Sequence, residues 1–170
     1  MATGQTSKLD YLSHHEAGHA AVAFSFGLHL ERVWIDQPSD RGWTKLTEES
    51  LKRRTDLQHV LIALAGGRAE KNLDPSCVGQ RTGSDEDEGR ALTTLGECLR
   101  SHFEGRSDDY IDKMCDRVNY ILAARCALIV RDNWPAIQRL AALLARRASG
   151  TRLVELTGEE AERALTGEGG

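Results

Sequence analysis

Apolar residues recur every three to four positions near the start of the chain, between Leu9 and Phe26. This is the spacing of one face of an α-helix, so it predicts a helix over this segment. Ser7 is a residue type that caps helix N-termini, and Gly27 is one that ends helices. The first helix should therefore run from about Ser7 to Phe26.

The period changes to two directly after this helix. Residues 31–36 place Val33 and Ile35 two positions apart, with polar or aromatic side chains between them, which is typical of a β-strand. Residues 37–40 have the composition of a turn, and residues 42–46 are a candidate for a second, returning strand.

Helical spacing returns in the rest of the chain, where capping and turn residues divide it into segments. Thr55 and Gln58 match a capping box, Pro75 and Gly79 indicate a loop, and Pro135 must end the helix that precedes it. The predicted helices run from Thr55 to Ala65, from Ser84 to about Phe103, from Ser107 or Asp108 to Asn133, from Ala136 to Arg147, and onward from Thr157.

These patterns predict an α+β fold that is mainly helical, with a small β-sheet and a C-terminal helical bundle. The 170 residues are about the length of one domain. We expect a single domain over residues 1–166 and a disordered tail over residues 167–170.

Composition narrows the class of protein. The net charge of −4 gives no reason to expect a nucleic-acid partner. The longest apolar stretch, residues 20–28, is too short to span a membrane, and the N-terminus lacks the apolar core of a signal peptide. Four widely spaced cysteines without a C-x-x-C pair do not favour a structural zinc knuckle. We expect a soluble, cytoplasmic protein with no membrane span of its own.

One motif on the first helix has a specific chemistry. His15-Glu16-Ala17-Gly18-His19 is an H-E-x-x-H sequence. His15 and His19 lie four residues apart, on one helix face, and can bind one Zn²⁺. Glu16 points about a quarter turn away, so it can take a proton from a zinc-bound water without being a ligand. Gly18 costs about 1 kcal/mol relative to Ala inside a helix, which indicates that another backbone comes close.

A catalytic zinc site needs a third protein ligand and an open position for water. Four acidic residues at the start of a later helix are candidates: Asp85, Glu86, Asp87 and Glu88. Acidic residues also favour the first turn of any helix, so position alone does not decide among them.

The string HEAGHA at residues 15–20 resembles the zinc helix of the peptidase domain of FtsH-type AAA proteases. Leu64-Ala-Gly-Gly-Arg-Ala-Glu70 is similar to the GGRAAE segment of that family, and Thr82-Gly-Ser-Asp-Glu-Asp87 to its TGASND stretch. The similarity covers roughly residues 14–165. It implies a zincin-like metallopeptidase with His15, His19 and Asp87 as zinc ligands and Glu16 as the catalytic base.

The chain departs from the family in three respects. His14 replaces the tyrosine before HEAGHA, and Lys71 stands where the GGRAAE segment would place Glu, unless Glu70 takes that role. No G-x-x-x-x-G-K-S/T sequence occurs, so the chain has no ATPase motif. A separate ATPase partner is possible, and the sequence does not predict an oligomeric state.

The resemblance implies a zinc-dependent endopeptidase that cuts unfolded or extended polypeptides. The alternative is a zinc-binding interaction module without proteolytic activity, against which the presence of Glu16 argues. Extended peptides commonly add to a sheet edge, so we expect the strand at residues 31–36 to pair with substrate. The three tryptophans are expected to be core or interface anchors, and His14, His29, His59 and His102 to lie outside the metal site.

Overall fold

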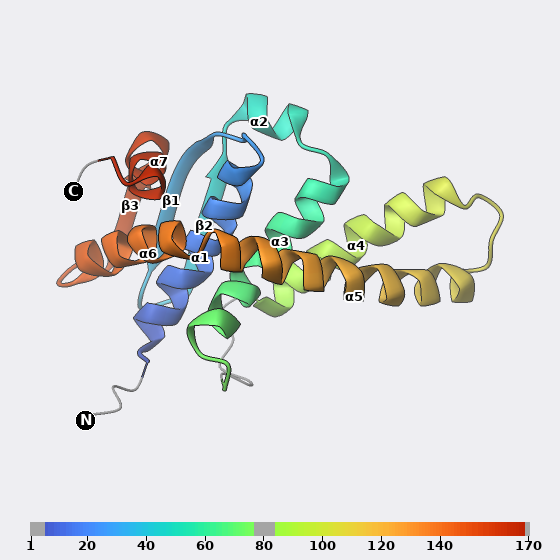
Figure 1. Cartoon of the computed structure of the whole chain (residues 1–170), viewed down its shortest axis with the longest axis horizontal. Coiled ribbons are helices and arrows are strands. Elements are labelled where there is room, and N and C mark those ends of the chain that lie inside the picture. The colour runs from blue at the N-terminus through green and yellow to red at the C-terminus, as the bar shows by residue number, and fades with distance from the viewer. Residues whose placement is uncertain (1–5, 77–83, 169–170) are drawn as a thin grey trace.

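The computed structural model describes residues 6–76 and 84–168, and helices dominate this part of the chain (Figure 1). The elements are α1 (Lys8–Ser25), β1 (Leu30–Asp36), β2 (Arg41–Leu46), α2 (Glu48–Arg53), α3 (Asp56–Leu73), α4 (Ser84–His102), α5 (Asp108–Asp132), α6 (Trp134–Ala148), β3 (Leu153–Thr157) and α7 (Gly158–Thr166). The mainly helical α+β class predicted from the sequence is confirmed. Two elements were not predicted, α2 and β3.

Capping side chains set the helix starts that the sequence indicated. Ser7 caps α1 by accepting a hydrogen bond from the backbone N–H of Asp10, and Thr55 and Gln58 form the predicted capping box of α3. Two predictions fall outside the described residues: the capping role of the Ser84 side chain, and most of the loop after Pro75.

The sheet has three antiparallel strands in the order β2-β1-β3. On β1, Val33 is paired with Thr44 of β2 on one side and with Leu156 of β3 on the other. Both edges of β1 are therefore occupied, and the expectation that residues 31–36 pair with substrate is wrong. The local pattern of residues 31–36 does not reveal this pairing, because β3 comes from residues 153–157, far along the chain. Within the described residues, β2 has an unpaired edge and also packs against α1.

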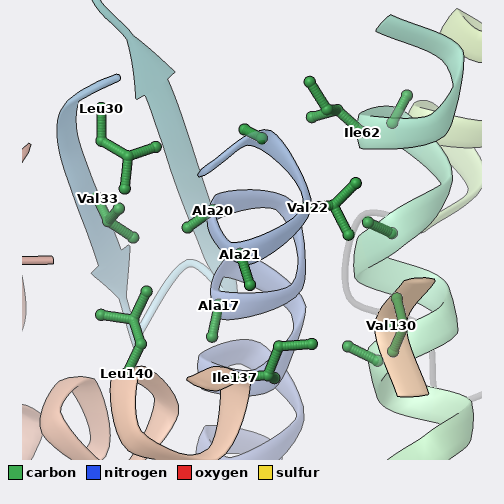
Figure 2. Close-up of a cluster of buried hydrophobic side chains, with 14 of the residues drawn as sticks. Ala17, Ala20, Ala21, Val22, Leu30, Val33, Ile62, Val130, Ile137 and Leu140 are labelled. Atoms are coloured by element: carbon green, nitrogen blue, oxygen red, sulfur yellow. The ribbon is translucent and has the colours of Figure 1, made fainter. Parts of the chain in front are cut away.

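The core forms around α1, which packs against the sheet, α3 and α6. Figure 2 shows its alanines and Val22 between the side chains of β1, such as Val33, and those of α3, such as Ile62. The small side chains of Ala17, Ala20 and Ala21 are fully or almost fully buried, and they let neighbouring elements approach closely.

The helices of the second half pack on different parts of the molecule. Helix α5 packs on α3 and α4, and the hairpin of α4 and α5 extends away from the sheet (Figure 1). Helix α6 packs on α1, and α7 packs on β1 and α6. Gly167 ends α7 in a left-handed conformation, with φ 83°, and Glu168 donates its backbone N–H to Arg163. Helix α1 thus lies at the centre, where it can present side chains to three neighbours.

Candidate metal centre

Helix α1 places the two histidines of the H-E-x-x-H sequence next to each other. His15 and His19 are both buried, and their Nε2 atoms are 3.0 Å apart. Their rings meet edge to face, with centroids 4.6 Å apart. The helical spacing of four residues therefore brings one nitrogen of each ring to the same point, as the sequence predicted.

Helix α4 adds a carboxylate at this point. Oδ2 of Asp87 lies 3.0 Å from Nε2 of His15 and 3.1 Å from Nε2 of His19. Among the described residues, these three side chains form the group of potential metal ligands. Asp85, two residues earlier on α4, is exposed to solvent. The structure thus brings together the three residues that the resemblance selected and leaves Asp85 outside.

The remaining ring nitrogens identify the tautomers. Nδ1 of His15 lies 2.6 Å from Oε1 of Glu70, and Nδ1 of His19 lies 2.6 Å from the carbonyl oxygen of Ile62. A carbonyl oxygen and a carboxylate only accept hydrogen bonds, so each Nδ1 must donate. In the neutral rings both Nε2 atoms then present lone pairs, and they meet an oxygen of Asp87 that also only accepts.

Three acceptors that face one point need a positive charge between them. The pKa shifts of His15 and Asp87 also favour positive charge at this point. Burial lowers the pKa of His15, but its hydrogen bonds with Asp87 and Glu70 outweigh burial and raise this pKa to about 10. Burial opposes ionisation of Asp87, yet its hydrogen bonds with the histidines hold its pKa well below the usual range.

The donor set fits a divalent metal ion. Two imidazole nitrogens and one carboxylate oxygen form a common catalytic zinc set, with bonds of about 2.0–2.2 Å. Ligands at such bond lengths on a tetrahedral ion are roughly 3.3 Å apart, close to the separations of 3.0–3.1 Å here. The contacts at Nδ1 are of the kind that orients metal-binding histidines. The residues present therefore fit zinc, as well as other divalent metals that imidazole suits.

Two glycines allow α1 and α3 to come this close. A Cβ atom added to Gly66 would lie 2.6 Å from both Cε1 of His15 and Nε2 of His19. One added to Gly18 would lie 2.8 Å from the carbonyl oxygen of Ala65. The close backbone approach predicted from Gly18 is confirmed, and Gly66 provides the matching close approach on α3.

Glu16 is buried beside the cluster but is not part of it. The hydroxyl of Thr44 on β2 donates to its Oε2 at 2.9 Å and to its backbone oxygen at 3.0 Å. Burial raises the pKa of Glu16, and the nearby His19 and His15 act against this rise. Glu16 is thus a carboxylate with a raised proton affinity, held between the metal-binding residues and β2.

A cleft of about 940 Å³ opens over these residues. One side is formed by β2, from Arg41 to Leu46, and the opposite side by α3 and the start of α4. Trp34 and Trp43 both line the cleft, and Trp43 is 50% exposed. Trp34 on β1 and Trp43 on β2 are therefore not core residues, while the expectation that they anchor an interface stays a prediction.

The other histidines lie outside the cluster, as expected. His14 stacks on Trp134 with ring centroids 5.5 Å apart, and burial lowers its pKa. His29 and His102 are exposed, while His59 is partly buried and lines the cleft.

Sequence reasoning left two contacts of the centre unassigned. Glu70, whose role was open between two alignments, contacts His15, while Lys71 is exposed. Thr44 was not singled out, because nothing local to β2 marks it as a partner of Glu16.

Comparison with known proteins does not assign a family: no family model and no curated protein matches this chain. In the described part of the chain, no helix has the length and apolar character that crossing a membrane requires.

Proposed function

We propose that this chain is a zinc-dependent endopeptidase of the H-E-x-x-H type, with a zincin-like arrangement of helix and sheet. The observation that carries the proposal is the convergence of His15, His19 and Asp87 on one point beside the buried Glu16, which is not a ligand. A site of purely structural function has no need of such a carboxylate, and it usually has a fourth protein ligand.

The residues divide the chemistry among them. His15, His19 and Asp87 would hold the zinc ion, which supplies Lewis acidity that activates a water molecule and polarises the scissile carbonyl. Glu16 takes the proton of the attacking water and delivers it to the leaving amine. Its raised pKa suits this exchange, because the group must both accept and return a proton. The hydroxyl of Thr44 fixes the position of the carboxylate.

The substrate in this proposal is an extended polypeptide. The strand β2 has one edge unpaired within the described sheet, and it forms one side of the cleft. An extended peptide can add to such an edge through main-chain hydrogen bonds. This assigns to β2 the role that the sequence pattern had suggested for β1.

The decisive experiment measures release of labelled fragments from casein by the purified, zinc-loaded chain, without ATP. We expect cleavage that stops on addition of a chelator and returns with zinc. Glu16→Gln should keep about one zinc per chain and lose hydrolysis, because the residue moves a proton and is not a ligand. A wild-type chain that binds zinc but releases no fragment from casein or from a peptide library would favour the non-proteolytic zinc module.

A further inference from the structure

The cleft continues past the metal-binding residues toward the end of α2. The residues that line it there include the apolar Leu46, Leu51 and Ile62, and also Arg54, directly after α2, and His59, in the first turn of α3. His59 lies about two helical turns before Gly66 on α3, or about 10 Å along the helix axis. An extended peptide advances about 3.3 Å per residue, so this end of the cleft is about three residues from the scissile bond.

Arg54 brings a positive charge to this end. It is partly buried, and its guanidinium makes no hydrogen bond or ion pair with any residue in ranges 6–76 and 84–168. Asp56 interacts with it electrostatically, but Asp56 does not line the cleft and accepts a hydrogen bond from the thiol of Cys98. The guanidinium of Arg54 is therefore available to a ligand that enters the cleft.

The charge of a second arginine near this end, Arg90, is already paired with carboxylates. Arg90 contacts Oδ1 of Asp87 at 3.2 Å and the carboxylate of Glu86 at 3.7 Å. Its guanidinium also lies over the ring of Trp43, 5.6 Å from the centroid. These contacts pair the charge of Arg90, so Arg54 is the arginine at this end of the cleft whose charge remains for a ligand, among the described residues; Arg41 lines the cleft at the far end of β2.

His59 adds a hydrogen-bonding group beside Arg54. Its Nδ1 lies 3.2 Å from the hydroxyl of Thr94 on α4, which fixes the ring. Burial, and then the field of Arg54, lower the pKa of His59. When the hydroxyl of Thr94 donates to Nδ1, the proton of the neutral ring is on Nε2, which can donate in turn.

We propose that Arg54 and His59 form a carboxylate-binding subsite at the α2 end of the cleft, which selects polypeptide substrates that place a carboxylate there. This rests on the proposed function, since it assigns the substrate class of the same cleft. Arginine offers two N–H groups in the geometry that a carboxylate accepts. The apolar wall suits the methylene groups of a glutamate side chain, and a free C-terminal carboxylate has the same headgroup. The two sources are separated by the choice of peptide.

The test measures binding of labelled peptides by fluorescence anisotropy to the chain carrying Glu16→Gln, so that nothing is hydrolysed. One arm scans a single Glu through a Gln-containing parent peptide whose C-terminus is an amide. The other arm compares the free acid and the amide of the parent. In one of the two arms we expect the carboxylate to tighten binding about tenfold, the size of one charge-assisted hydrogen-bonded contact in a partly exposed site.

Variants then show which residue causes the preference for a carboxylate. Arg54→Gln in the same background should remove it, and Arg54→Lys should keep part of it because the charge remains. Arg53→Gln is the matched control: it is the neighbouring arginine, loses the same charge, and does not line the cleft. It should keep the full preference.

The outcomes separate the subsite from the peptidase. Equal affinity for peptides with and without the carboxylate, or a preference that survives Arg54→Gln, overturns the subsite. Because the measurement is binding, a chain that prefers acidic peptides through Arg54 but whose wild-type form cuts none supports the subsite and overturns the peptidase.

Discussion

Asp87 divides its two oxygens between different partners. Oδ2 faces the two histidines, whereas Oδ1 accepts a hydrogen bond from Arg90 one turn later on α4. This bond orients the carboxylate so that a single oxygen points to the metal position. Both oxygens of Asp87 therefore have partners at the site, and Asp85 is an exposed residue outside it.

Exchange of these two acids for amides tests this assignment. Asp87→Asn removes the negative charge from the point where the acceptors meet, so zinc affinity should fall by more than the 10–100-fold typical of groups that only contact a ligand. Asp85→Asn is the matched control and should leave metal content and hydrolysis nearly unchanged. Measuring the zinc content of both variants after dialysis tests the assignment. Loss of zinc from the Asp85 variant alone would show that Asp85 is the ligand and that the assignment to Asp87 is wrong.

Glu70 acts through His15. Its carboxylate lies 2.6 Å from Nδ1 of His15, where it fixes the orientation of the ring. It also makes the lone pair of Nε2 more basic, so that Nε2 is a stronger ligand for a metal. Glu70→Gln should weaken zinc binding by about 10–100-fold without abolishing it. Lys71→Gln, at the exposed neighbouring position, should have no effect. Competition with a chromophoric chelator measures both affinities, and equal values for the two variants would show that Glu70 does not tune the site.

At the scale of the elements, the features that could be predicted from the sequence are those that depend on residues close together in the chain. The H-E-x-x-H spacing fixes the relation of His15 to His19 within one helix, and capping residues fix several helix starts. The errors concern partners brought together by the tertiary fold. No local feature of residues 31–36 tells that β3 covers their second edge, and none marks Thr44 as the partner of Glu16.

Length explains the two missed elements. Helix α2 has 6 residues and β3 has 5, too few for a period to stand out from chance. Strand β3 is stable because β1 is next to it, and the structure rather than the propensity of residues 153–157 decides its conformation. The class of fold could thus be predicted from the sequence, but the order of the strands could not.

Gly66 tests the packing of α3 against the metal face of α1. In Gly66→Ala the new methyl would lie 2.6 Å from the rings of both histidines, so these rings must move off the metal position. We expect loss of zinc and of hydrolysis although Ala favours helix formation. Gly89→Ala on α4 is the control, since a Cβ there meets nothing within 4 Å. It should keep the site and stabilise the helix by up to about 1 kcal/mol. Full zinc content in Gly66→Ala would contradict the packing described here.

At the scale of the whole molecule, the candidate centre connects three helices. His15 and His19 come from α1, their Nδ1 partners from α3, and Asp87 from α4. Without a cation, these buried acceptors repel one another or must share protons, which opposes the packing of α4 against α1 and α3. Occupation of the site should therefore stabilise the fold as well as supply chemistry.

This link predicts a thermal shift whose size follows from mass action. A ligand that binds only the folded chain, at a free concentration about 100 times its Kd, adds about 2.7 kcal/mol of stability. For a domain of this size, about 2–4 °C accompanies each kcal/mol, so zinc should raise Tm by about 5–10 °C over the chelated chain. Glu16→Gln should retain the shift, because Glu16 is not a ligand, whereas Asp87→Asn should lose most of it. A scan of the three proteins with zinc and with chelator provides the test. An equal shift in the Asp87 variant would mean that zinc stabilises the molecule at some other place, and that the three helices are not joined through this cluster.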